Sequence, residues 1–157
     1  EAFETAVAAA RALGWDLRPV WRSRLAPTEA RPWNELLRDA DADTVTVLLD
    51  EAARLLPGNL AAEEEGGLLP STVSGQVLSS FLERLATMPG VGGACILAGL
   101  DSPVVRHRNL ALRALAAWSQ DRWPSGAHER VARMAADDPA PSVRAGAAAA
   151  WGEVAEA

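Results

Sequence analysis

The feature that most restricts the fold is an internal repeat in the C-terminal part of the chain. Laying residues 100–116 over residues 136–152, a shift of 36 positions, brings similar residues together. The matched pairs are Asp101 with Asp137, Pro103 with Pro139, Arg108 with Arg144, Ala111 with Ala147, Ala114 with Ala150, and bulky Leu115 with bulky Trp151. Repeat periods of about 20–50 residues are typical of helical solenoids, because one helix pair cannot bury its own apolar face and must stack on a neighbour. Stacked helical hairpins are therefore predicted for this region.

Apolar residues recur at helical spacing along the rest of the chain as well. After Ser71 they recur three and four residues apart as far as Leu85, which places them on one face of a helix. The other helices expected outside the matched segments span residues 2–13, 32–40, 43–56, 92–100 and 127–136. With one helix in each matched segment, and no alternating strand pattern, the sequence predicts an all-α fold of about eight helices.

Two segments of the repeat resemble HEAT repeats. Residues 100–106, LDSPVVR, followed by residues 110–115, LALRAL, are similar to the opening helix of that family, and so are residues 137–147, DDPAPSVRAGA. The family pattern is D-x-x-P-x-V-R-x-x-A-x-x-A-L, and the first copy departs from it by two extra residues before its A-x-x-A-L. The resemblance spans at most residues 71–157 and is clearest over residues 100–152. It implies an α-α superhelix of antiparallel helix pairs with an extended surface.

Composition divides the chain into three regions. Residues 58–70 contain three consecutive acids followed by two glycines, and they have no apolar stripe to bury. Such a segment is typical of a linker. We therefore expect an N-terminal helical region at 1–57, an acidic, glycine-containing linker at 58–70, and the HEAT-like repeat region at 71–157.

Charge limits the classes of function. All 15 basic residues are arginine, and with 21 acids the net charge is −6. Without lysine the chain cannot supply a Walker A lysine or a Schiff-base amine. The acidic balance and the lack of a basic footprint disfavour a nucleic-acid partner, because phosphate is repelled.

Other features of composition bear on location. The uncharged runs are shorter than the roughly 20 apolar residues that a membrane-spanning helix needs, and no signal peptide is recognised. Cys95 is the single cysteine, so an internal disulfide is impossible. A cytoplasmic protein without a membrane partner is expected, and the abundance of alanine and arginine suggests a bacterial source.

Four charged residues of the repeat predict a ladder between neighbouring copies. An Asp just before a helix can accept hydrogen bonds from the first-turn amides, and an Arg one turn later can reach the carboxylate of the next copy. The residues expected in this ladder are Asp101, Asp137, Arg108 and Arg144.

The run Arg106-His107-Arg108 is a candidate anion- or partner-binding site. It places positive charge near a helix start, where the helix dipole favours negative charge. Free amides at that end, with Arg144 at the matched position of the second copy, would help to hold a phosphate or carboxylate. The favoured alternative is that the arginines pair with the aspartates of the repeat and that His107 is simply exposed.

The six tryptophans fall into two groups. Those near helix ends of the repeat are expected to fill gaps that alanines leave: Trp118, Trp123 and Trp151. The N-terminal group is interleaved with arginines, which is consistent with core packing for most of its members and with a partner-binding surface wherever they are exposed. The residues of this candidate surface are Trp15, Trp21, Trp33 and Arg22.

A calcium site is one interpretation of Asp39, Asp41 and Asp43, with Asp50 eleven residues after the first. These positions resemble the oxygen ligands of an EF-hand loop. Thr44 stands where the loop needs glycine, and Asp50 is shorter than the usual bidentate Glu. An interhelical loop with Asp43 as the N-cap of the next helix is the favoured interpretation.

No grouping of residues points to catalysis or to a cofactor. His107 and His128 lie in different expected helices, Cys95 reads as a small core residue, and residues 90–93 suit close helix packing better than a dinucleotide loop. We expect a non-catalytic protein–protein interaction or scaffold module, which binds another protein or another domain of its own chain. The alternative is a HEAT-like nucleic-acid binder with an arginine-lined surface.

Overall fold

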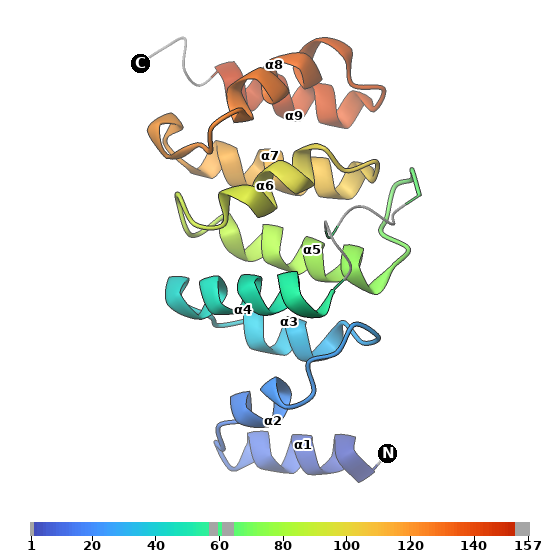
Figure 1. Ribbon diagram of the computed structural model, residues 1–157, viewed down its shortest axis with the longest axis vertical. Helices are drawn as coiled ribbons and strands as arrows, with labels where there is room; N and C mark the ends of the chain where they lie inside the picture. The colour runs from blue at the N-terminus through green and yellow to red at the C-terminus, as the bar shows by residue number, and fades with distance from the viewer. Residues whose placement is uncertain (1, 57–59, 61–64, 153–157) are drawn as a thin grey trace.

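The computed structural model describes residues 2–56, 60 and 65–152. Within these residues the chain forms nine α-helices, one short 3-10 turn and no β-strand, so the all-α prediction is confirmed. Figure 1 shows the helices stacked along the long axis of the molecule, with α1 at one end and α8 and α9 at the other.

The N-terminal helices are α1 (Ala2–Ala12), α2 (Arg18–Arg22), α3 (Arg31–Leu37) and α4 (Ala42–Leu55). The sequence did not predict α2, because five residues are too few to show a periodic apolar face. The prediction that Asp43 caps α4 is wrong. Asp41 is the N-cap, and its Oδ1 accepts a hydrogen bond from Thr44 N at 2.8 Å. Asp43 lies in the first turn, where its charge still complements the helix dipole.

The C-terminal helices follow the repeat. They are α5 (Val73–Leu85), α6 (Gly93–Leu100), α7 (Val105–Ala117), α8 (Ala127–Asp137) and α9 (Pro141–Gly152), with the 3-10 turn at Gln120–Arg122. The helices α7 and α9 begin at residues 105 and 141, which differ by the 36 positions of the sequence repeat.

The helices pack in two rows. The helices α3, α5, α7 and α9 contact one another in that order, and this set is called the odd row below. On the other side α6 contacts α8, and the sequential neighbours α5 and α6, α6 and α7, and α8 and α9 also pack together. The two middle helices of the odd row, α5 and α7, therefore each contact two helices of the row, and the end helices α3 and α9 each contact one.

One continuous hydrophobic cluster runs from α1 to α9. Trp33 and Phe81 are fully buried where α3 meets α5, with ring centroids 6.4 Å apart. Ala111 and Ala114 of α7 and Ala147 of α9 have no exposed surface. A Cβ on Gly99 of α6 would lie 3.0 Å from Ala111 Cβ, and one on Gly146 of α9 would lie 3.6 Å from Leu112 Cδ1. Small side chains thus let α7 approach both α6 and α9 at the packing density of a protein interior.

The glycines at the start of α6 allow a close approach, as the sequence predicted. Gly92 adopts a φ of +65°, and a Cβ placed there would lie 2.9 Å from Leu85 Cδ1. A Cβ on Gly93 would lie 2.9 Å from Pro124 Cβ. A larger residue would displace the neighbouring helix or loop.

Part of the expected linker at 58–70 lies outside the described residues, namely 58, 59 and 61–64. Residues 65–70 run past the start of α7. There Gly67 O accepts a hydrogen bond from Val105 N at 2.8 Å, and Leu68 O accepts one from Arg106 N at 3.2 Å. This part of the linker is thus attached to the repeat region by its backbone.

Candidate functional site

The start of α7 does not form the convergent cationic site that the sequence suggested. Arg106 pairs with Glu83 of α5 at 2.7 Å. His107 is fully buried rather than exposed, with Nδ1 2.8 Å from Ser102 Oγ and Nε2 2.8 Å from Gly75 O. Because a carbonyl can only accept, Nε2 donates to Gly75 O, and the imidazole joins α7 to α5.

The amides at this helix start are also occupied. The carbonyls of residues 67 and 68 already accept from the first amides of α7. A phosphate or carboxylate would have to displace these backbone bonds, which offsets the usual attraction of a helix N-terminus for anions.

The charged ladder expected between the repeats is mostly wrong. Of its four residues only Arg108 reaches an acid of the other copy, and that acid is Asp138. Asp101 is the C-cap of α6 and Asp137 is the last residue of α8, so neither caps the start of a helix. Arg108 Nη2 donates to Asp138 Oδ1 at 3.1 Å, and its Nε lies 2.9 Å from Asp138 Oδ2. Asp137, the expected partner, is exposed on α8. Asp101 instead pairs with Arg130 of α8 at 2.8 Å. The sequence match pointed to residue 137, but the side chain that turns inward belongs to the next residue.

The same hydrogen bonds recur in both copies at the shift of 36 residues. Arg108 Nη1 donates to Ser102 O at 2.9 Å, and Arg144 Nη1 donates to Asp138 O at 2.5 Å. The side chains of Ser102 and Asp138 each accept from the amide two residues later, at 3.2 and 2.9 Å. In both copies an arginine thus fastens the helix to the loop that precedes it, which gives Arg108 and Arg144 a structural role.

The N-terminal tryptophans do not form one surface. Trp21 and Trp33 are buried, and Trp33 Nε1 donates to Ala26 O at 3.1 Å. Arg22 pairs with Glu51 at 3.2 Å. Trp15 is 67% exposed, so it alone of the three is available to a partner.

The tryptophans of the repeat behave largely as expected. Trp118 and Trp123 are buried, and their indole nitrogens donate to Leu85 O and Leu115 O, each at 2.9 Å. Trp151 is 44% exposed, because α9 is the last helix of the odd row and no further described helix covers it.

The calcium interpretation is not supported by the geometry. Within residues 2–56, 60 and 65–152, no group of three or more His, Cys, Asp or Glu side chains could hold a metal ion. Asp39 and Asp41 line a pocket beside the α1–α2 loop, whereas Asp50 lines a groove between α4 and α6. Asp41 is engaged as a helix cap.

Polar bonds cross the odd row between each pair of neighbouring helices. Their members are Asn34 and Ser80 at 2.6 Å between α3 and α5, Glu83 and Arg106 at 2.7 Å between α5 and α7, and Asn109 and Ser142 at 3.2 Å between α7 and α9. The exposed face of the row is therefore a polar strip beside the hydrophobic cluster, and it is named the polar strip below.

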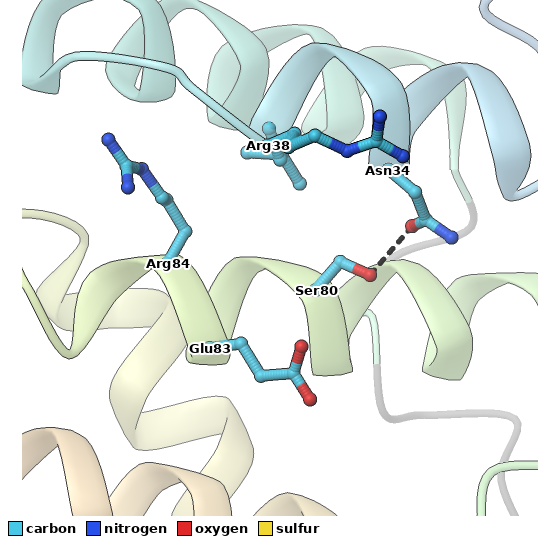
Figure 2. A pocket seen from close by; sticks show the side chains of 6 residues that line it. Asn34, Arg38, Ser80, Glu83 and Arg84 are labelled. Atoms are coloured by element: carbon cyan, nitrogen blue, oxygen red, sulfur yellow. Dashed lines mark hydrogen bonds between the residues drawn. The ribbon is translucent and has the colours of Figure 1, made fainter.

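A groove of about 420 Å³ opens on the polar strip between α3 and α5. Its lining residues are Asn34, Leu37, Arg38, Ser80, Glu83 and Arg84. Figure 2 shows the side chains of Arg38 and Arg84 directed toward opposite ends of the groove, with the Asn34–Ser80 hydrogen bond beside Arg38. An elongated ligand lying along α3 would therefore meet a cation at either end.

The arginines of this face differ in how their charge is balanced. Arg84 Nε donates to Ala40 O at 2.8 Å, and Nη2 donates to the same carbonyl, so the guanidinium is fixed against the loop between α3 and α4. In the described part of the chain no carboxylate pairs with Arg84 or with exposed Arg113 of α7. Arg38 shares Glu35 with Arg11. Positive charge on the polar strip is thus only partly neutralised.

Sequence reasoning missed this groove. Asn34 and Arg38 are four residues apart, as are Ser80 and Arg84, so each pair shares one face of its helix. These polar pairs within apolar helices were the available signal. Nothing in the sequence showed that α3 and α5 would be neighbours.

Cys95 is buried, and burial raises the pKa of its thiol to about 12. A thiol in this environment is not a nucleophile at neutral pH, because the thiolate is the reactive form. The expectation that Cys95 is a small core residue is confirmed.

No protein-family model matches the chain, and no curated protein or solved structure matches it significantly. Among the helices described here, none has the length and apolar character needed to cross a lipid bilayer.

Proposed function

We propose that the chain is a non-catalytic interaction module of HEAT-like helical repeats, and that it binds an acidic segment of a partner protein along the polar strip. The observation that carries the proposal is the groove between α3 and α5, with Arg38 and Arg84 at its ends and Arg113 further along the strip. The setting is the bacterial cytoplasm, in keeping with a single buried thiol and an arginine-rich composition.

The absence of a catalytic role is part of the proposal. The thiol of Cys95 is buried in the hydrophobic cluster. Both ring nitrogens of His107 are occupied by hydrogen bonds within the fold. A row of helices that bury their apolar sides on one another leaves its outer face for recognition.

Charge reversal tests the proposal. Arg38→Glu and Arg113→Glu place acids on the strip, so retention of a partner from a lysate of the source cell should fall on the order of tenfold. Arg133→Glu is the matched control, because Arg133 is also exposed and lies on α8, outside the odd row. Quantitative mass spectrometry of the retained proteins reads the result. A partner lost equally with all three variants would refute the polar strip as its binding surface.

A nucleic acid is the second candidate, because the same arginines could neutralise phosphates. The net charge of −6 argues against it. Fluorescence anisotropy with duplex DNA at rising salt distinguishes the two. Tight binding that weakens steeply with salt, and is lost in Arg113→Glu, would replace the protein partner with DNA.

A further inference from the structure

A second pocket, of about 380 Å³, lies on another face of α3. The α1–α2 loop, the end of α3 and the start of α4 enclose it. Its charged and aromatic lining residues are Trp15, Asp16, Arg18, Glu35, Asp39 and Asp41. It is named the acidic pocket below.

The backbone holds Trp15 at this pocket. Gly14, at a φ of +71°, ends α1, and hydrogen bonds run from Gly14 N to Arg11 O and from Trp15 N to Ala10 O, each at 3.0 Å. This paired closure is the Schellman arrangement, and it fixes the direction in which the chain leaves the helix. Trp15 is thereby placed outside α1 with 67% of its surface exposed, while Trp21 and Trp33 are buried.

The lining carries a net negative charge. It contains four carboxylates and one guanidinium, that of Arg18, while Arg11 and Arg38 pair with Glu35 from outside the lining. The hydrogen bonds from Arg18 hold the pKa of Asp16 below its ordinary value, and those from Thr44 do the same for Asp41, so both stay ionised at neutral pH. The C-terminal end of α1, with its partial negative charge, adds to the same potential.

One carboxylate of the pocket remains available to a ligand. Asp16 is bound by Arg18, Asp41 caps α4, and Glu35 pairs with Arg11 and Arg38. Asp39 is exposed, and no residue of the described chain pairs with it. In the described part of the chain, these carboxylates are not grouped so that three or more could hold a metal ion, so a bare metal ion is a poor occupant of the pocket.

We propose that the acidic pocket binds an arginine side chain of a partner protein, with its guanidinium stacked on Trp15 and paired with Asp39. An exposed indole beside ionised carboxylates offers the two contacts that a planar cation can make together, one through its face and one through its edge. A lysine ammonium lacks the planar face and is the weaker ligand. The proposal goes beyond the function proposed above, because it uses another surface and a ligand of opposite charge.

The test uses acetyl-Ala-Arg-Ala-amide and its citrulline counterpart, which has nearly the same shape and no charge. The Trp15 indole N–H resonance, assigned by its absence in Trp15→Ala, is followed in the whole chain by nuclear magnetic resonance. We expect a saturable shift of this resonance with the arginine peptide and none with the citrulline peptide. Equal shifts with both peptides, or no saturable shift, would overturn the proposal.

Two further variants make the result specific to this pocket. Asp39→Asn should weaken binding of the arginine peptide by roughly threefold, and Trp15→Ala by roughly fivefold. Because Trp15→Ala lacks the indole resonance, its binding is followed through the backbone amide resonances of α3. Leu13→Ala is the matched control, because Leu13 is 69% exposed and does not line the pocket. A loss in Leu13→Ala equal to that in Trp15→Ala would count against the proposal.

Binding of the arginine peptide to the acidic pocket does not depend on residues of the polar strip. Arg113→Glu lies on α7 and should leave binding of the arginine peptide unchanged. Loss of the acidic partner with retained arginine binding, or the reverse, therefore separates the two proposals.

Discussion

At the scale of single residues, Arg108 and Asp138 form the most buried ion pair among the described residues, with 10% and 6% of their side-chain surface exposed. The pair joins α7 to the loop before α9. Removing one partner leaves the other charge buried without compensation, which is far more costly than losing an exposed pair.

Arg108→Ala should lower the free energy of unfolding by about 3 kcal/mol. Arg130→Ala, which removes the more exposed pair with Asp101, should cost about 0.5 kcal/mol. Urea denaturation followed by circular dichroism gives both values. Similar losses in the two variants would show that burial of the first pair does not set its contribution.

Cys95 should be inert toward alkylation in the native state. With its pKa raised to about 12 and its side chain buried, the thiolate fraction at pH 8 is very small. Intact-mass measurement after incubation with iodoacetamide should show unmodified protein, and addition of urea should give complete single labelling. Rapid native labelling would contradict the burial of α6.

At the scale of elements, each helix cap is a local hydrogen bond whose contribution to stability can be measured by changing one residue. Thr72 Oγ1 accepts from Gly75 N at 3.0 Å at the start of α5. Thr72→Ala should therefore cost about 1 kcal/mol of stability, whereas Thr72→Ser, which keeps the hydroxyl, should cost little. Thermal unfolding of the two variants makes the comparison, and an equal loss in both would assign the effect to the methyl group instead.

The cap of α4 should make stability depend on acid. The Asp41 carboxylate has a pKa lowered from 3.8 by its bonds to Thr44, so its contribution is complete above that ordinary value and is lost as the pH falls through the lower folded value. Asp41→Asn keeps a capping oxygen without the titration. The loss of stability below about pH 4 should be shallower in this variant than in the parent chain. Identical acid limbs in urea melts would remove Asp41 as a contributor.

Most of the elements could be predicted from sequence, because a periodic apolar face is a local property. The helix α2 was not predicted, because its five residues are too few to show a periodic apolar face. The N-cap of α4 was predicted at Asp43 instead of Asp41, because capping depends on a backbone conformation that the sequence does not display. The groove could not be predicted at all. Asn34 and Ser80 are 46 residues apart, and their contact depends on which helices become neighbours.

At the scale of the whole molecule, protection should be highest in the middle of the odd row. The helices α5 and α7 pack on both sides within the row, whereas α9 packs on one. In arrays of this kind, stability is shared through nearest-neighbour contacts, so ends open first. Native-state hydrogen exchange should show slower exchange in α5 and α7 than in α1 and α9, and uniform protection along the chain would contradict this.

The matching bonds of Arg108 and Arg144 have a consequence for how such a chain can grow. Each copy brings its own fastening between helix and loop, and one acid of the later copy reaches the arginine of the earlier one. A duplicated block of 36 residues would contain both the arginine and the aspartate of this ion pair. Lengthening the protein by gene duplication would then require no new ion pair between the old and the added helices, only an alanine-lined helix face on which the added helices can pack.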